Sequence, residues 1–371
     1  MNATTVAIDL AKDVFELAFA DANARIVQRK RLRRARFLAE FQNRPPLTII
    51  MEACGTAHYW ARRLSGLGHI PVLLPPRHCK PFVRGNKTDR TDAAGLVTAH
   101  CVGGIRPVPA KSAEQQGIQG LHRVREHHKH QRTASINVVR GLLREFGIPI
   151  PVGAAKLRPA ALAALEDGDN DLPMALRLRL DELLDEIVLH TEAMQRIEAD
   201  LAEFASRDVR SQRFQTATGV GLITATALSA SQGELDRFPS GRHFASSLGL
   251  TPKEFSSGNT RRLGKLTRRG DIYLRQLLIH GGRSLLQSAA LRRKQGKELD
   301  RLADWALRLS ARVGHNKAAC AVANKIARRL WAAEHHRTSF DPNHVSQAPG
   351  THRPKGAATL LSVHRLHRAS S

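Results

Sequence analysis

Four carboxylates near the N-terminus have the residue types and spacing of a metal-assisted phosphoryl-transfer site. Asp9 lies within an apolar strand, and Glu52 directly follows the apolar run Leu47–Met51. Asp89 and Asp92 are three residues apart at the start of a predicted helix, so both lie on one helical face. Such clustered charges repel unless a cation gathers them, and oxygen ligands suit Mg²⁺ or Mn²⁺. Paired hard cations can activate the attacking oxygen and stabilise the leaving oxygen during phosphodiester cleavage.

Each carboxylate also has a simpler explanation. Asp9 could pair with an arginine, Asp89 could cap a helix, and Asp92 could be a first-turn acid favoured by the helix dipole. Their combination in one chain with a net charge of +25 favours the metal site.

A serine pair followed by a basic segment marks a second possible chemistry. Ser256 and Ser257 precede Gly258, and strong phosphate ligands follow them at Arg261, Arg262, Lys265, Arg268 and Arg269. A serine hydroxyl attacks phosphorus only if its proton is removed and the developing charge is neutralised. No histidine lies close in sequence to act as the base. On these residues alone, a DNA-binding loop whose serines merely hydrogen-bond phosphates stays open.

Two other segments are candidates for phosphate contacts. The glycines of Gly219-Val220-Gly221 allow a tight turn before a helix N-terminus, where free N–H groups can approach a phosphate. Arg29, Arg31 and Arg33 alternate along a basic predicted strand. A ligand-free glycine turn and a solvated charge run are the corresponding alternatives.

Composition points to a polyanionic partner and excludes several classes of protein. Lys and Arg number 58 against 33 Asp and Glu, with a sequence pI near 11.1. No apolar run approaches the ~18–20 residues that span a bilayer, so we expect no membrane association. The four cysteines are scattered, without the spacing of a zinc or redox site, and suit a reduced compartment. We therefore expect a cytoplasmic, nucleoid-associated protein.

The apolar patterning predicts three structured regions and a tail. Residues 1–110 alternate strands and helices, including a third strand over Arg25–Arg33 and a helix over Arg36–Gln42. Residues 111–211 are helical, residues 212–335 form a mainly helical unit, and the basic segment 336–371 is predicted to be disordered.

The region 111–211 contains a heptad-like apolar seam. Apolar residues recur in steps of four and three from Leu176 to Phe204, interrupted by His190. The seam predicts a coiled-coil arm that joins copies of the chain into a homo-oligomer, a dimer or tetramer. The alternative is one long helix packed inside a bundle.

The carboxylate motifs carry a specific resemblance. Ala7-Ile8-Asp9-Leu10-Ala11-Lys12, Met51-Glu52-Ala53 and Lys87-Thr88-Asp89-Arg90-Thr91-Asp92 are similar to motifs of the DEDD-type transposases of bacterial insertion sequences. These form the IS-one-ten and IS-eleven-eleven group. The resemblance implies an α/β RNase H-like, RuvC-like first domain with Asp9, Glu52, Asp89 and Asp92 as its metal ligands.

The second half extends this resemblance. The segment from Gly219 to Leu277 is similar to the group's second domain, which implies Ser257 as nucleophile, with Ser256 as the alternative. The Gly219 turn resembles a helix–hairpin–helix element, although Thr218 stands where proline is more common. The resemblance also implies a structured guide RNA encoded by the element, and an active site whose two parts come from different protomers.

These features together predict a transposase that cuts and rejoins DNA through a serine and a metal-binding tetrad. Two alternatives remain open. One is a RuvC-like nuclease or Holliday-junction resolvase that uses metal and water without the serine. The other is a non-catalytic nucleic-acid-binding protein, although clustered carboxylates would not help such a protein to bind.

Overall fold

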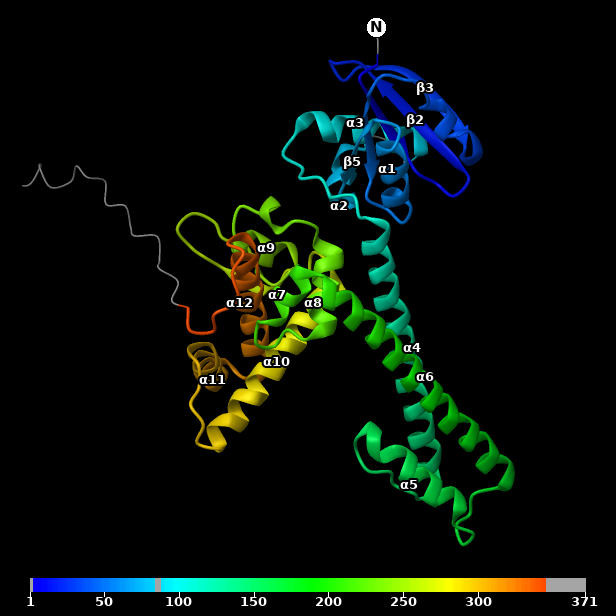
Figure 1. Cartoon of the computed structure of the whole chain (residues 1–371), viewed down its shortest axis with the longest axis vertical. Helices are drawn as coiled ribbons and strands as arrows, with labels where there is room; N and C mark the ends of the chain where they lie inside the picture. The colour runs from blue at the N-terminus through cyan, green and yellow to red at the C-terminus, as the bar shows by residue number, and fades with distance from the viewer. Residues whose placement is uncertain (1–2, 84–87, 345–371) are drawn as a thin grey trace, which may run out of the picture.

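A five-stranded sheet forms the N-terminal unit of the computed structural model, which describes residues 3–83 and 88–344 (Figure 1). Its strands lie in the order β3-β2-β1-β4-β5. Neighbours among β1, β2 and β3 run antiparallel, whereas β4 and β5 run parallel to β1. The strands are β1 (Thr5–Asp9), β2 (Val14–Ala20), β3 (Ile26–Arg33), β4 (Thr48–Glu52) and β5 (Ile70–Leu74). The mixed α/β sheet predicted from the sequence is confirmed.

Helices cover both faces of this sheet. Alternate strand residues point to opposite faces, so each strand contributes to two cores. One core holds Ile8 and Met51 and is covered by α1 (Ala57–Ser65). The other holds Ala7 and Ile50 and is covered by α3 (Asp89–Val102), with α2 (Pro76–Cys79) and η3 (Lys80–Phe82) leading towards it.

The helix predicted over Arg36–Gln42 is wrong. The segment forms two short 3₁₀ turns, η1 (Arg34–Arg36) and η2 (Leu38–Glu40). Phe37 and Phe41 are both fully buried, and the Phe37 ring packs edge-on against Trp60. A segment this short has little helical stability of its own, so burial of the two rings decides its path.

Two long helices form an arm below the sheet unit, α4 (Ala113–Glu145) and α6 (Met174–Arg207), which lie side by side and are joined through α5 (Ala154–Glu166) (Figure 1). Ser112 and Gln115 form a capping box that starts α4.

The predicted seam on α6 packs within the chain, as in the alternative of a helix inside a bundle. Leu180 and Ile187 share a core with α4 and α5, and Leu201 and Phe204 share one with α4 and α8. His190, the polar residue of the seam, meets His128 of α4 with 3.0 Å between their Nδ1 atoms. The seam is therefore not a free oligomerisation surface, because α4 of the same chain covers it.

The C-terminal unit is mainly helical and contains the largest core of the described residues. Its elements are α7 (Val209–Gln215), α8 (Leu222–Gln232), η4 (Leu235–Arg237), α9 (Gly241–Ser247), the hairpin strands β6 (Pro252–Glu254) and β7 (Leu263–Leu266), α10 (Ile272–Lys294), α11 (Arg301–Val313) and α12 (His315–His335).

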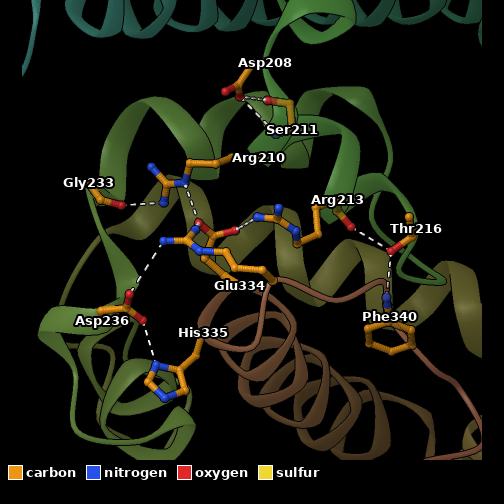
Figure 2. A network of polar contacts seen from close by, with 11 residues as sticks. Asp208, Arg210, Ser211, Arg213, Thr216, Gly233, Asp236, Glu334, His335 and Phe340 are labelled. Carbon is orange, nitrogen blue, oxygen red and sulfur yellow. Dashed lines mark hydrogen bonds and ion pairs between the residues drawn. The ribbon is translucent and has the colours of Figure 1, made fainter.

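A buried carboxylate ties α7 to the end of α12 (Figure 2). The Glu334 side chain is 3% exposed and pairs with Arg210, Arg213 and Arg337. Asp236 extends the network at the surface, where it contacts His335 at 2.8 Å. These contacts fix the C-terminal turn of α12 against the start of the unit.

The predicted boundary at residue 336 is too early. Phe340 is buried in the C-terminal core, and its N–H donates to Thr216 Oγ1 at 2.9 Å. The remainder of the predicted disordered tail, from residue 345, lies outside the described residues. No helix in ranges 3–83 and 88–344 has the length and apolarity needed to cross a membrane.

Candidate active site

Asp9 and Glu52 end adjacent parallel strands. The register of β1 and β4 sets Ile8 opposite Met51, so Asp9 and Glu52, the next residues, lie side by side. Ala7 and Ile50, two residues earlier on each strand, belong to the core under α3. Because side chains alternate along a strand, Asp9 and Glu52 point to the same face. Both residues are half-buried. The strand-end position predicted for Glu52 is confirmed, whereas Asp9, predicted to lie within a strand, is the last residue of β1.

A third carboxylate, which the sequence analysis missed, extends this pair into a row. Glu16 of β2 lies opposite Asp9 in the antiparallel register, on the same face. Its Oε1 lies 3.2 Å from Nε of Arg31. The signal in the sequence is the spacing of two residues between Glu16 and Ala18, which puts both on the face that α3 covers.

Asp89 and Asp92 lie in the first turn of α3. Thr88, not Asp89, caps this helix: Thr88 Oγ1 accepts the Thr91 N–H at 3.2 Å, and Thr91 Oγ1 accepts the Thr88 N–H at 3.0 Å. The helix packs along β1, β2 and β4. Arg29 Nη1 also donates to the carbonyl oxygen of Arg90 at 3.1 Å, which ties the first turn to the sheet edge.

The four predicted ligands form two pairs, one at the strand ends and one on α3. Within residues 3–83 and 88–344, no group of three or more His, Cys, Asp or Glu side chains lies close enough to hold a metal ion. The donor set still suits a hard divalent cation, because every donor is a carboxylate oxygen. The strand-end pair also occupies the edge where open α/β sheets bind ligands. Lys87 of the quoted motif lies outside the described residues.

The pKa of a neighbouring thiol, Cys79, is affected by the charge of Glu52. Burial raises the pKa of the Cys79 thiol to about 11, and the charge of Glu52 contributes to this shift. Cys79 belongs to the core under α3, so Glu52 projects to that side of the sheet. The negative charge of Glu52 therefore acts on the side of the sheet that α3 covers.

The predicted basic strand is the exposed edge strand β3. Arg29, Arg31 and Arg33 are all exposed and alternate with residues of the opposite face. Arg29 and Arg31 lie across from Ala18 and Glu16, so their side of the sheet is also that of the carboxylates. A phosphate backbone that follows this edge would pass beside the carboxylate row.

Ser257 lies at the tip of the hairpin formed by β6 and β7. Ser257 and Thr260 exchange backbone hydrogen bonds of 3.2 and 3.1 Å around the two-residue loop Gly258-Asn259. Gly258 adopts a φ of 53°, a left-handed conformation that glycine tolerates. The hairpin therefore presents Ser257 to solvent.

The two serines of this hairpin have different surroundings. Ser256 Oγ donates to Glu254 Oε1 at 2.7 Å and accepts the Arg262 N–H at 3.1 Å. In the described part of the chain, Ser257 Oγ has no hydrogen-bond partner. The hydroxyl of Ser256 is thus used in hydrogen bonds within the hairpin, whereas the hydroxyl of Ser257 is exposed and can contact another molecule.

Cations surround the hairpin, and close backbone packing fixes its base. Arg275 is buried, and its Nη1 donates to the carbonyl oxygens of Leu248 and Arg269, both at 3.3 Å. Gly249 and Gly270 have positive φ, and a Cβ on either would overlap a neighbouring carbonyl oxygen. The predicted phosphate ligands all stay exposed on this fixed base: Arg261, Arg262, Lys265, Arg268 and Arg269.

The glycine turn before α8 has a packing role. Gly219, at φ +87°, lies against the backbone of Gly281 in α10, where neither residue has room for a Cβ. Gly221 caps α8, and a Cβ there would meet nothing within 4 Å. Close approach of α10 therefore explains Gly219 without a phosphate, whereas Gly221 remains open to one.

The carboxylates and the serine belong to separate bodies. The sheet unit and the helical C-terminal unit lie apart in Figure 1, with the start of α4 between them. Contacts between the units include Arg106, which donates to the Arg237 carbonyl oxygen at 3.0 Å.

Both halves of the chain match family models. Residues 6–148 match a DEDD transposase model of the IS110 group, and residues 211–297 match a model described as "Transposase IS116/IS110/IS902 family".

Curated relatives cover nearly all of the chain. It is 40% identical to a "Probable family 20 transposase" of Pseudomonas aeruginosa, over 92% of this chain and 100% of the relative. It is 35% identical to the transposase for insertion sequence element IS1111A of Coxiella burnetii, over 88% of both chains. It is 33% identical to the transposase for element IS1328 of Yersinia enterocolitica, over 91% of this chain and 99% of the relative.

Proposed function

The chain belongs to the IS116/IS110/IS902 family of transposases, and from this we propose that it moves a bacterial insertion sequence with Ser257 as its nucleophile. The observation that carries the proposal is the difference between the two serines. Ser256 is held by Glu254 and the Arg262 N–H, whereas Ser257 stands at the hairpin tip among exposed cations.

In the proposed step, Ser257 Oγ attacks a DNA phosphorus and loses its proton to a base from outside the hairpin. A phosphoserine ester forms as the bond to one deoxyribose oxygen breaks, and that oxygen leaves as a hydroxyl. Attack by a hydroxyl of another DNA end re-forms a phosphodiester and frees the serine. Arg261, Arg262 and Lys265 would neutralise the charge that develops on the phosphate.

A divalent cation, Mg²⁺ or Mn²⁺, would be held by Asp9, Glu52, Asp89 and Asp92. The DEDD domain implies dependence on a divalent metal in general, and the carboxylate donor set suits a hard cation. When bound, such an ion stabilises the negative charge of the scissile phosphate and of the leaving oxygen. The carboxylates would orient the ion, and Arg29 and Arg31 of β3 would hold the phosphate beside it.

A homo-oligomer would bring the two parts together. The sheet unit and the hairpin lie in separate bodies of one chain, so we propose that the carboxylates of one protomer act with Ser257 of its partner. Because α4 covers the seam of α6, the contact between copies would use exposed apolar residues of the arm, such as Leu178 and Leu189.

A structured RNA from the same element is the proposed guide that pairs with donor and target DNA. The charge of +25 is compatible with holding such an RNA, although charge does not distinguish RNA from DNA. Purification from cells that carry the native flanking DNA, followed by RNA sequencing, would test this part. Recovery of no element-derived RNA would contradict it.

Recombination in cells tests the central proposal. The gene with its flanking DNA is placed on a donor plasmid beside a target plasmid, and junctions are counted by sequencing. We expect Ser257→Ala and Asp92→Asn to abolish the junctions and Ser256→Ala to retain them. Asp13→Asn, in the turn between β1 and β2, is the matched control for the carboxylate change.

The other outcomes discriminate the alternatives. Junctions that survive Ser257→Ala but vanish with Ser256→Ala would move the nucleophile by one residue. Activity in both serine variants with loss in Asp92→Asn would favour metal-only cleavage by water, as in a junction resolvase. Activity in all of the variants would overturn both the serine and the metal roles.

A further inference from the structure

A basic groove lies in the C-terminal unit, away from the serine hairpin. It has a volume of about 880 Å³ and runs between α9, α11 and α12. Six cationic side chains line it: Arg242, Arg301, Arg308, Lys325, Arg328 and Arg329. Most of this lining follows residue 297, where the match to the second family model ends.

Cations outnumber acids in and around the groove, where Asp300 and Asp341 lie near Arg329. Among the residues that the structure describes, Asp304 is the only acid in the lining, and it already pairs with Arg293 and Arg308, each at 3.0 Å. Four other cations of the lining have no acidic partner among residues 3–83 and 88–344: Arg242, Arg301, Lys325 and Arg328. The sequence beyond the described residues, 345–371, contains no Asp or Glu that could neutralise them.

Like charges are crowded on α12. Burial lowers the pKa of Lys325, and the charges of Arg329 and Arg328 lower it further. Lys325 Nζ lies 3.8 Å from the centre of the Trp305 ring, so an aromatic face supplies part of its stabilisation. Such crowding is unfavourable in the free protein and is relieved when an anion binds.

The walls of the groove are rigid. A Cβ on Gly241 of α9 would lie 2.6 Å from the carbonyl oxygen of Arg328, so the two helices are in direct backbone contact. Trp331 Nε1 donates to the carbonyl oxygens of Leu235 and Phe238 at 3.0 and 3.1 Å, which fixes its indole. The cations are thus presented on a preformed surface, which reduces the entropy lost on binding.

We propose that this groove binds the phosphodiester backbone of DNA, as a contact separate from the Ser257 hairpin. Spaced arginines on a rigid surface match successive phosphates, and DNA is the polyanion on which a transposase acts. The groove would hold DNA that flanks the reacting phosphate. This binding does not depend on whether Ser257 is the nucleophile.

The salt dependence of DNA binding tests the groove. The full chain is titrated into a fluorescent duplex that carries an element end, at several salt concentrations. The test variant is Arg301→Gln with Arg328→Gln, which breaks no acidic ion pair. The control is Arg312→Gln with Lys317→Gln, which removes the same charge from exposed positions on the same two helices, outside the groove lining.

We expect the slope of log K against log salt to become shallower by about 1.8 in the test variant, since each phosphate contact contributes about 0.9. The control should keep a slope closer to that of the wild-type protein. Equal slopes in the two double variants would overturn the proposal. If the test variant does not fold, as judged by circular dichroism, Arg242→Gln on α9 replaces it, with an expected change of about 0.9.

A matched RNA duplex distinguishes the kind of nucleic acid. A larger change of slope for DNA than for RNA supports the assignment to DNA. A change seen only with RNA would overturn it in favour of an RNA-binding groove.

Discussion

Ser256 Oγ donates a hydrogen bond of 2.7 Å to Oε1 of Glu254, which lies two residues earlier on the same side of the hairpin. The same oxygen accepts the backbone N–H of Arg262 from the opposite strand at 3.1 Å. Ser256 therefore links both strands of the hairpin that carries Ser257. This arrangement separates a structural serine from an available one, although the two are adjacent in the sequence.

Ser256→Ala should loosen the hairpin without unfolding the protein. The Arg262 amide loses its only acceptor in the described structure, so its hydrogen exchange should accelerate, while global stability changes by less than about 0.5 kcal/mol. Exchange measured by mass spectrometry on a peptide that contains Arg262 would check this. Ser257→Ala is the control and should leave the exchange unchanged. Equal exchange in all three proteins would show that Ser256 does not hold the hairpin.

Glu334→Gln should destabilise the C-terminal unit strongly. The carboxylate is 3% exposed and balances the charges of Arg210, Arg213 and Arg337, which would stay crowded without it. Breaking a buried ion pair of this kind costs about 3–5 kcal/mol. Urea unfolding would measure the loss. Asp236→Asn, at the exposed end of the same network in Figure 2, should cost less than about 1 kcal/mol. Similar losses in both variants would contradict the role of burial.

His122 should make the protein sensitive to acid. Burial lowers the pKa of His122 to about 4, from 6.5. Thr226 Oγ1 donates its hydrogen to the Leu222 carbonyl oxygen, so His122 Nε2–H donates to Thr226, and His122 Nδ1 accepts the Tyr273 hydroxyl. A second proton on the ring would reverse the contact with Tyr273, because Nδ1–H would then donate to the hydroxyl oxygen, and it would place a charge in a buried site.

The sign of this pH dependence follows from the two pKa values of His122. The unfolded state takes up the proton near pH 6.5 and the folded state only near pH 4, so stability is present above pH 6.5 and is lost as the pH falls towards 4. The loss from this group is about 3 kcal/mol. Denaturant unfolding at several pH values should show a flatter profile for His122→Gln. The exposed His127, changed to Gln on the same helix, should retain the wild-type profile. Identical profiles for all three proteins would contradict the prediction.

Gly281→Ala should separate α10 from the turn before α8. A Cβ on Gly281 would overlap the carbonyl oxygen of Gly219, which is a backbone atom, so no side-chain movement can relieve the overlap. We expect a loss of at least about 2 kcal/mol and a lower melting temperature. Gly221→Ala has open space for its Cβ and a negative φ, so its cost should stay within about 1 kcal/mol. A weaker affinity of Gly221→Ala for DNA, with its fold retained, would identify Gly221 as the phosphate contact of this turn. Tolerance of Gly281→Ala would contradict the close packing.

The sequence by itself determined the features that depend on local pattern. Apolar runs located β1 and β4 and placed Glu52 directly after one of them, whereas the end of β1 at Asp9 and its pairing beside Glu52 came from the structure. The same alternation applies to Glu16, which lies two residues before Ala18 on the same face of β2. The net charge and the Ser257 segment indicated a nucleic-acid protein without any knowledge of its shape.

Only the tertiary structure decided which surface each pattern meets. The seam from Leu176 to Phe204 specified a buried face, but periodicity cannot distinguish α4 of the same chain from a second copy, because either partner buries the same apolar area. Phe340 looked like part of a tail because one aromatic residue has no periodicity. The groove cations come from α9, α11 and α12, and their convergence depends on long-range helix packing that no local spacing encodes. The distinction between Ser256 and Ser257 likewise arises from the strand register, which brings Arg262 back to one serine and leaves the other at the tip.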